Sequence, residues 1–294
     1  MESGASGLRV TRFDDPAAFK ARAFARLLED EAQNCVIFGV LARLTEAALR
    51  RKDESPPLML AVEDVDGCVV SVGTMTSPFP IVLSPSPAPA AAAMGESIAR
   101  NAIPLGGVTG EAATAQAFAA AWSRCTGGAT RSDTRLGVYQ LEQTIPPRAV
   151  EGSFRQALTS DMDALLPFAQ MFFREIREPL AEANLYLGRA IDEERLFVWC
   201  DPPDRIVSMA AFAGPTPSGV RVNFVCTPPA LRGRGYACNC VAALTTRLLQ
   251  TPGRRRVFLF TDLSNPTSNR IYQAIGYRYL GEQHKILFMG ATCA

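Results

Sequence analysis

The stretch that most constrains the fold of this chain is PPALRGRGYACN, residues 228–239. The apolar run VRVNFVCT precedes it, and the segment that follows, YACNCVAALTTRLLQ, has the apolar spacing of a helix. We therefore expect a strand, a short loop and an immediate helix. Gly233 and Gly235 stand just before that helix, where the lack of side chains lets a large group approach the backbone.

The start of this helix offers a binding site for phosphate. Backbone N–H groups in the first turn of a helix have no partner within it and carry partial positive charge, so anions bind there. Arg232 and Arg234 would add charge at the rim. The spacing does not fit G-x-x-x-x-G-K-[ST] or G-x-G-x-x-G, so two common nucleotide loops are excluded. A plain glycine turn with solvated arginines is the alternative interpretation.

The sequence farther along favours the phosphate interpretation. R-G-R-G-Y-A fits the pattern [QR]-x-x-G-x-[GA], with Arg232, Gly235 and Ala237 in the fixed places, and N-P-T-S-N-R-I-Y-Q-A-I-G-Y follows from residue 265. This combination resembles the GNAT superfamily of N-acetyltransferases, over roughly residues 153–290. The first half resembles a degenerate copy of the same fold, as in tandem-GNAT proteins, in the order of its predicted strands and helices.

The resemblance implies that acetyl-CoA binds as a co-substrate. It implies that the pyrophosphate lies against the backbone of Arg232, Gly233, Arg234, Gly235, Tyr236 and Ala237. It implies that the pantetheine arm lies along Val225, Cys226 and Thr227, and that Asn265 lies beside the cofactor. Tyr272 matches the tyrosine that in many members donates a proton to the leaving thiolate.

These residue types suit the chemistry. An amine attacks a thioester directly, so the enzyme needs no nucleophile of its own, and the chain has no convincing Ser-His-Asp or Cys-His set. The usual pKa of tyrosine, about 10, exceeds the ~8.5 of a thiol, so full proton transfer before bond breaking is unfavourable by ~2 kcal/mol. We therefore expect a concerted donation from Tyr272, or one helped by its position on a helix. The alternative is that Tyr272 is only a core aromatic.

A base is needed if the acceptor is a lysine-like amine. Removing a proton from a group of pKa ~10.4 at neutral pH costs roughly 4–5 kcal/mol. The strand VRVNFVCT contains no Asp or Glu. Glu175, Glu178 and Glu182 lie in the first helical region of the second half and are candidates, as is a chain of water molecules. The alternative for the three glutamates is a solvated helix face.

Composition limits the other classes. The chain has 294 residues, of which 48% are hydrophobic, enough for two cores. A net charge of +1 gives no reason to expect nucleic acid or an anionic membrane as partner. No apolar run reaches the ~20 residues of a membrane span, and the N-terminus lacks the layout of a signal peptide, so we expect a cytoplasmic protein.

The cysteines predict no metal site. There are eight, with no CxxC pair, and His284 is the only histidine, so the spacing of a zinc cluster is missing. Most stand in apolar runs typical of buried reduced thiols. A Cys-His nucleophile pair would have to use His284.

The segment IPPRAVEG (145–152) reads as a linker, because two prolines and a glycine interrupt both periodicities. We predict a degenerate GNAT-like domain over 1–147 and a catalytic, acetyl-CoA-binding GNAT domain over 152–294. The fold class is α/β, with two tandem domains, each a mixed, mostly antiparallel twisted sheet flanked by helices. Within the first, NCVIFGVLARLTEAALRR predicts a helix over about 33–51.

The first half lacks the features of the phosphate loop. Its corresponding loop, around 84–89, is rich in proline, which has no N–H to offer an anion, and the matching helix has Phe118 and Trp122 but no tyrosine. We therefore expect the first half to have lost cofactor binding and to shape the acceptor cleft or stiffen the pair.

The predicted function is transfer of the acetyl group of acetyl-CoA to a primary amine, by direct attack in a ternary complex. The partners are then acetyl-CoA and an amine acceptor. Small amines, amino acids, polyamines and protein N-termini all fit the sequence as acceptors. The alternative is a non-catalytic acyl-CoA-binding sensor or scaffold, because the two-domain members that this chain resembles, with one inactive half, imply that the fold can lose activity.

Overall fold

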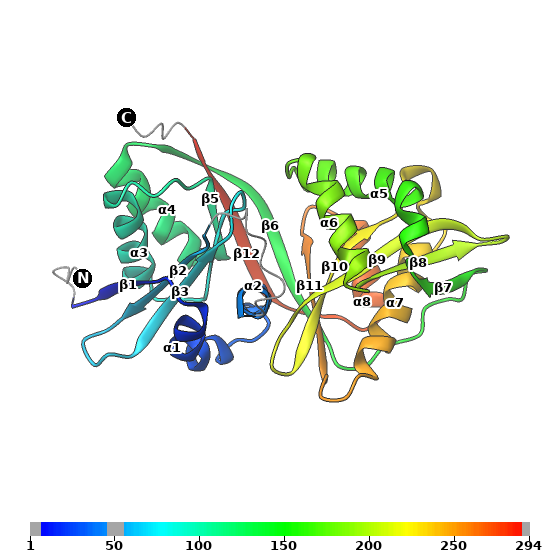
Figure 1. Ribbon diagram of the computed structural model, residues 1–294, viewed down its shortest axis with the longest axis horizontal. Helices are drawn as coiled ribbons and strands as arrows, with labels where there is room; N and C mark the ends of the chain where they lie inside the picture. The colour runs from blue at the N-terminus through cyan, green and yellow to red at the C-terminus, as the bar shows by residue number, and fades with distance from the viewer. Residues whose placement is uncertain (1–6, 46–55, 290–294) are drawn as a thin grey trace.

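The structure is a computed structural model that describes residues 7–45 and 56–289 (Figure 1). The first half contains β1 (Arg9–Phe13), α1 (Pro16–Leu28), α2 (Cys35–Thr45), β2 (Leu58–Glu63), β3 (Val69–Met75), β4 (Ile81–Leu83), α3 (Ala88–Arg100), β5 (Gly107–Glu111), α4 (Ala112–Thr126) and β6 (Ala129–Leu141). The second contains β7 (Ser153–Gln156), α5 (Met162–Glu175), α6 (Ala181–Asp192), β8 (Leu196–Asp201), β9 (Arg205–Pro215), β10 (Gly219–Cys226), α7 (Tyr236–Leu249), β11 (Arg256–Asp262), α8 (Pro266–Ala274) and β12 (Arg278–Met289). The helix predicted over 33–51 is present as α2, and positions 46–51 lie outside the described residues.

The strands form one mixed sheet that runs through both halves. Its order is β1-β2-β3-β4-β5-β12-β6-β11-β10-β9-β8-β7, with twelve strands in all among the described residues. Two pairs are parallel, β4 with β5 and β10 with β11, and the rest are antiparallel. The predicted α/β class and tandem arrangement are confirmed, with the two mixed sheets joined into one.

The join is a reciprocal exchange of long strands. β12, from the end of the chain, lies between β5 and β6, while β6, from the first half, lies between β12 and β11. Figure 1 shows these two strands crossing the molecule side by side. The division at 147 and 152 stays a prediction: no helix or strand occurs in 142–152, yet the sheet is continuous across the halves.

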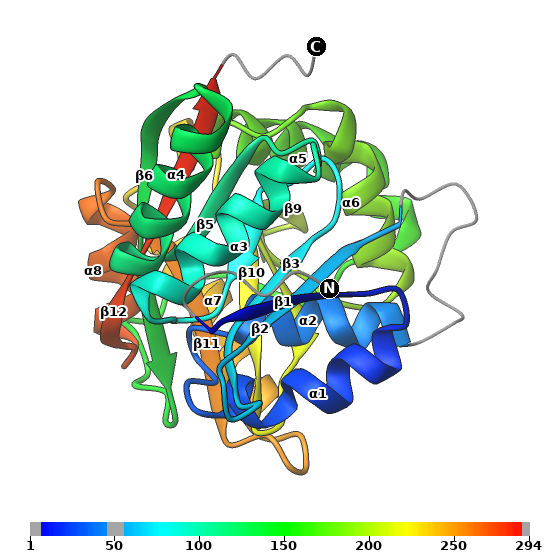
Figure 2. The ribbon, with the colours of Figure 1, turned by 90° about the vertical axis from the view of Figure 1, so that its left-hand side faces the viewer.

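Helices cover both faces of the sheet in each half (Figures 1 and 2). In β2, alternate residues face different cores because strand side chains alternate. Leu58, Leu60 and Val62 pack with the apolar side chains of α3 and α4. Met59 and Ala61 pack instead with those of α1 and α2.

The second half repeats this layering. Val220 and Val222 of β10 share a core with Val241 and Leu244 of α7, and Tyr272 of α8 belongs to the same core. The core on the other face joins apolar side chains of α5 and α6 to β8 and β9. The strand, helix and loop around residue 235 therefore rest on a core on each side.

The first half also packs directly against the second half through α2 and the segment before it. Gly39 of α2 meets Gly214 of β9 so closely that a Cβ on Gly39 would lie 2.7 Å from the Gly214 Cα. The Glu31 carboxylate accepts hydrogen bonds from the Ser218 N–H at 2.7 Å and the Ser218 hydroxyl at 2.6 Å. These contacts hold α2 over the sheet of the second half.

Candidate functional site

The candidate site begins where two parallel strands part. β10 pairs with β11 only over Gly219–Val222 and Arg256–Leu259, although β10 continues to Cys226 and β11 to Asp262. At the parting, the register of β10 against β9 shifts between Asn223 and Cys226, and Phe224 takes a φ of 53°. This bulge turns the following residues and leaves an opening between the strand ends.

The loop that follows leads directly into α7, as the sequence predicts. Gly233 has φ 77° and Gly235, the N-cap of α7, has φ 84°, a region that glycine adopts without strain. Six successive backbone N–H groups have no acceptor among the described residues, those of Gly233, Arg234, Gly235, Tyr236, Ala237 and Cys238. A helix start with unpaired N–H groups attracts an anion, because the helix dipole adds to the hydrogen bonds.

Two side chains fix the shape of this loop. Nε of Arg232 donates to the Thr227 carbonyl at 2.9 Å, and its guanidinium also pairs with Glu175. Nδ2 of Asn239 donates to the carbonyls of Gly235 and Arg148, each at 3.0 Å. Arg232 therefore braces the loop, and Asn239, which the sequence argument missed, ties the linker to the start of α7.

The three residues expected along the pantetheine arm face different ways. Val225 packs against the core that contains Tyr272, whereas Cys226 belongs to the core under α5 and α6. The Thr227 hydroxyl lies 2.8 Å from that of Ser208. Burial raises the pKa of the Cys226 thiol to about 12, so it stays protonated near neutral pH and is no nucleophile.

Asn265 is the N-cap of α8, and its Oδ1 accepts a hydrogen bond from the Ser268 N–H at 3.1 Å. Asn269, one turn on, donates to the Asp262 carbonyl at 3.0 Å and accepts from the Tyr139 hydroxyl at 2.8 Å. The side chain of Asn265 thus caps the start of α8. Its part in binding the cofactor stays a prediction.

Tyr272 lies on α8 with only 8% of its surface exposed. Its ring meets that of Tyr277 edge to face, with centroids 6.1 Å apart. Burial raises the pKa of Tyr272 well above its usual value. The hydroxyl is therefore protonated throughout the physiological range, as a proton donor must be, and transfer in advance of bond breaking is harder than the usual pKa implies.

The three candidate bases differ in their partners. Glu175 pairs with Arg232, and Glu178 pairs with Lys285 of β12 at 2.6 Å. Glu182 lines a cavity and has no ion-pair partner among the described residues. Its carboxylate is thus the one of the three that does not already neutralise a cation of the described chain.

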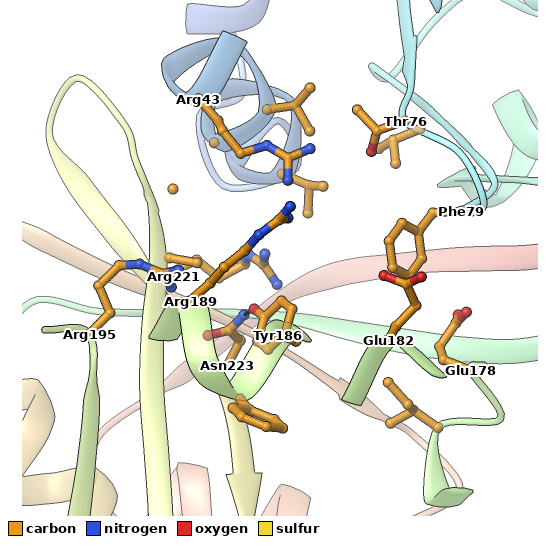
Figure 3. Close-up of a pocket in the computed structure, with 18 of the residues that line it drawn as sticks. Arg43, Thr76, Phe79, Glu178, Glu182, Tyr186, Arg189, Arg195, Arg221 and Asn223 are labelled. Carbon is orange, nitrogen blue, oxygen red and sulfur yellow. Dashed lines mark hydrogen bonds between the residues drawn. The ribbon is translucent and has the colours of Figure 1, made fainter. Parts of the chain in front are cut away.

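That cavity lies between the halves and has a volume of about 590 Å³. Its walls come from α2, β3, the segment leading into β4, α5, α6, β9 and β10. Figure 3 shows Arg43, Arg189 and Arg221 on one side of it and Glu178 and Glu182 on the other. This cavity was not predicted from the sequence. The alternation of Arg221 and Asn223 with apolar residues along β10 did indicate that one face of the strand is polar.

Other site types find no support in the described residues. No group of three His, Cys, Asp or Glu side chains in 7–45 and 56–289 is arranged to hold a metal ion. Seven cysteines are free thiols, and Cys293 lies outside the described residues. Within the same ranges, no helix has the length and apolar character to span a membrane.

Comparison with known proteins finds similar proteins over the region of the candidate site and over the whole fold. The FR47-like protein family model matches residues 207–286, which include the parting of β10 and β11, the loop, α7 and α8. A Drosophila protein of solved structure superposes with a TM-score of 0.69 at 12% identity, covering 97% of this chain and 99% of its own. A tandem GNAT protein from the clavulanic acid biosynthesis pathway gives 0.57 at 12% identity, covering 98% and 99%.

The chain has the tandem GNAT fold. A GCN5-related N-acetyltransferase from Sphaerobacter thermophilus also superposes on it, with a TM-score of 0.58 at 17% identity over 96% of this chain and 95% of its own. No curated protein sequence matches the chain. In this tandem GNAT chain, the roles of the predicted site residues stay predictions, because fold likeness at such identities assigns no role to a side chain.

Proposed function

We propose that this protein is an N-acetyltransferase that moves the acetyl group of acetyl-CoA to a primary amine in its second half. The observation that carries the proposal is the run of six unpaired N–H groups over Gly233–Cys238, at a helix start beside the parting of β10 and β11. Such a run suits a pyrophosphate, and the opening between the strands suits the arm that follows it. The exposed Arg234 side chain would add charge at the rim.

The proposed step is direct transfer in a ternary complex. The amine nitrogen attacks the thioester carbonyl carbon, a C–N bond forms and the C–S bond breaks. The sulfur leaves with the electron pair, and the Tyr272 hydroxyl supplies its proton as the bond breaks. A backbone N–H near Val225 stabilises the negative charge on the carbonyl oxygen. The extra proton of the attacking amine passes to Glu182 or to water, and Tyr272 regains a proton from solvent before the next turnover.

The buried position of Tyr272 supports a concerted donation. Its raised pKa makes a free tyrosinate costly, so proton transfer must keep pace with the growing charge on sulfur. Val225 packs against the same core as Tyr272, which supports a tyrosine directed at the strand opening. The proposed partners are acetyl-CoA and an amine. The proposed setting is the cytoplasm, in keeping with the free thiols of the described chain.

The test is turnover of acetyl-CoA by the full chain over a panel of amines. Release of free thiol would be followed in solution, and the mass of the product would identify an N-acetyl group. Acetylation of at least one amine class is expected. Tight binding of CoA by calorimetry, without transfer to any amine, would support the acyl-CoA-binding sensor or scaffold instead. Absence of CoA binding would overturn the proposed site altogether.

A further inference from the structure

Two residues that line the cavity between the halves each have a buried polar atom without a hydrogen-bond partner among the described residues, and these atoms indicate which ligand would fit. Nε of Arg221 is buried and donates to no acceptor among the described residues. Oδ1 of Asn223 is buried and accepts from no donor among them, although its Nδ2 bonds to the Tyr186 hydroxyl. A buried polar atom without a partner is unfavourable, so a ligand that supplies a partner to both atoms is favoured at this place.

The two atoms need opposite partners, a hydrogen-bond acceptor for Arg221 Nε and a donor for Asn223 Oδ1, and they lie close together. Arg221 and Asn223 are two residues apart on β10, hence about 7 Å along the strand, and both side chains line the cavity. The arginine lacks an acceptor and the asparagine lacks a donor. A ligand with an anionic group at one end and an amine at the other supplies both. The asparagine stands at the bulge, where β10 leaves β11, so the amine end lies toward the opening proposed for the thioester.

The charges on the cavity wall agree with this orientation. Arg43 of α2 points into the same part of the cavity as Arg221 (Figure 3) and has no carboxylate partner among the described residues. Glu182 lies on the opposite wall. The other two lining carboxylates are already paired, Glu178 with Lys285 and Glu193 with Arg195. An anion is therefore attracted to one side and an ammonium group to the other.

We propose that the acceptor is a small amine that also carries an anionic group, held by Arg221 and Arg43, with its amine directed toward Asn223 and Glu182. This inference rests on the proposed acetyl transfer and names the substrate class of that site. Arg43 belongs to the first half, so that half supplies a specificity residue although it has no phosphate loop of its own. Carboxylate and phosphonate share the required chemistry, and the test separates them.

The experiment measures kcat/KM for matched acceptors with the full chain. Short ω-amino acids are compared with their carboxamides and with aminoalkyl phosphonates of equal length. Converting an acid to its amide lowers the pKa of the amine, which leaves more of the reactive free base, so a preference for the acid reports recognition. We expect anionic acceptors to exceed the amides by about 10- to 100-fold, the range for a hydrogen bond to a charged group. The phosphonates show which anion fits.

Arg43→Gln and Arg221→Gln should remove that preference, lowering kcat/KM for anionic acceptors by about 10- to 100-fold and leaving the amides within a few-fold. Arg124→Gln on α4 makes the same charge change outside the cavity and should leave both series unchanged. If Arg221→Gln fails to fold, Arg43→Gln decides alone. Equal kcat/KM for acids and amides in the wild type would overturn the inference and leave the transferase proposal intact.

Binding gives a second readout that does not need turnover. Calorimetry with the same acids in the presence of CoA should show binding that weakens in Arg43→Gln and not in Arg124→Gln. If transfer is absent but this arginine-dependent binding is present, the proposed function fails and the anion site stands. If neither acids nor phosphonates bind in an arginine-dependent way, the site is wrong.

Discussion

The two halves of the molecule place a strand, a loop and a helix at corresponding positions of their sheets, and the two loops differ in what they offer a ligand. After β10, two glycines at positive φ expose a run of N–H groups at the start of α7. After β4, prolines 85, 87 and 89 remove three N–H groups before and within the first turn of α3. Of the remaining donors, the Ser84 N–H bonds to the Val72 carbonyl and the Ser86 N–H bonds to the Thr114 hydroxyl.

One fold can therefore carry the same backbone path with or without an anion site. In the first half, serine and threonine hydroxyls fill the space beside the loop: Ser86 Oγ donates to Ser71 Oγ at 2.8 Å, and Thr114 Oγ1 donates to the Ser86 carbonyl at 3.1 Å. Among the described residues, this loop leaves only the Ala88 N–H without an acceptor, so it presents no run of donors to an anion. The helix that follows β5 carries Phe118 and Trp122 where α8 carries Tyr272, all three buried.

The largest expected difference between the two halves is that one binds CoA and the other does not. Calorimetric titration of the full chain with CoA should give one site per chain, because, within the described chain, the loop after β10 presents a run of six free N–H groups and the loop after β4 presents no such run. The isolated first half is unsuited to this test, since its sheet includes β12 from the end of the chain. Two equal sites would break the contrast between the loops.

Tyr272→Phe tests the difference between α8, which carries a tyrosine, and α4, which carries Phe118 and Trp122 instead. Loss of a general acid lowers kcat by roughly 10²–10⁴-fold, while acetyl-CoA affinity should stay within a few-fold because the ring still packs. Tyr277→Phe is the matched control: that hydroxyl lies 2.9 Å from the Thr245 hydroxyl, so its loss should lower stability by about 1 kcal/mol and leave kcat nearly unchanged. Steady-state kinetics and urea unfolding measure both. A kcat loss below about tenfold for Tyr272→Phe would make it a core aromatic.

The contact between the halves is tested by Gly39→Ala. Its Cβ would lie 2.7 Å from the Gly214 backbone, so α2 must shift, and we expect a loss of about 1–3 kcal/mol in the free energy of unfolding. Gly188→Ala in α6 is the control, because its Cβ would meet Met162 at an ordinary 3.5 Å and the helix should gain about 0.5–1 kcal/mol. Urea unfolding compares them. Equal stability would show that the close packing of α2 on β9 is not needed.

The phosphate loop is tested at Gly233 and not at Gly235, where a Cβ would lie 2.9 Å from the Val150 side chain and disturb the linker as well. Apart from Gly233 and its two chain neighbours, no described residue has an atom within 4 Å of a Cβ placed on Gly233. Gly233→Ala should therefore weaken CoA binding by about tenfold, or about 1.4 kcal/mol, by obstructing the pyrophosphate.

Gly127→Ala, at the end of α4 in the first half, is the control for Gly233→Ala. It also has positive φ and open space at Cβ, so both variants carry similar backbone strain, on the order of 1–2 kcal/mol. CoA affinity should fall only in the Gly233 variant. An equal effect in both, or in neither, would remove the loop from the binding site.

The smallest effect on stability is expected from ion pairs near the two edges of the sheet. Arg155 of β7 forms a two-pronged pair with Asp161, at 2.7 and 3.0 Å, and lowers the pKa of that carboxyl. Asp161→Asn should cost about 1 kcal/mol at pH 7. A lowered native pKa contributes stability above the unfolded value, near 4, and loses it as the pH falls through the native value. The gap between wild type and variant in thermal unfolding should thus close below about pH 4. A constant gap would contradict the assignment.

At the other edge, Glu63 of β2 pairs with Arg9 and Arg22. Desolvation acts to raise the pKa of Glu63, and the hydrogen bonds from the two arginines outweigh it, so the net direction is downward. Its side chain is only 5% exposed. Glu63→Gln should therefore cost more than Asp161→Asn, because the variant leaves two arginines without their shared carboxylate.

The local units of this protein can be predicted from short segments of its sequence. An apolar strand, two glycines and a helix-spaced run predicted β10, the loop and α7, because backbone freedom and side-chain period are properties of a short segment. The prolines around residue 87 likewise predicted a poor anion site after β4. The tandem GNAT fold was expected from a resemblance to that superfamily, carried by the loop motif, the segment from Asn265 to Tyr277 and the order of the elements.

The tertiary structure alone decided how these units combine. The sequences of β6 and β12 do not predict that each strand lies inside the sheet of the other half. Strand pairing depends on contacts between residues far apart in the chain. The same holds for the partners of Glu175 and Glu178, and for Arg43 and Arg221, which come from different halves and meet at one cavity. The local sequence sets what a segment can form, while burial and charge between distant segments set what the site can bind.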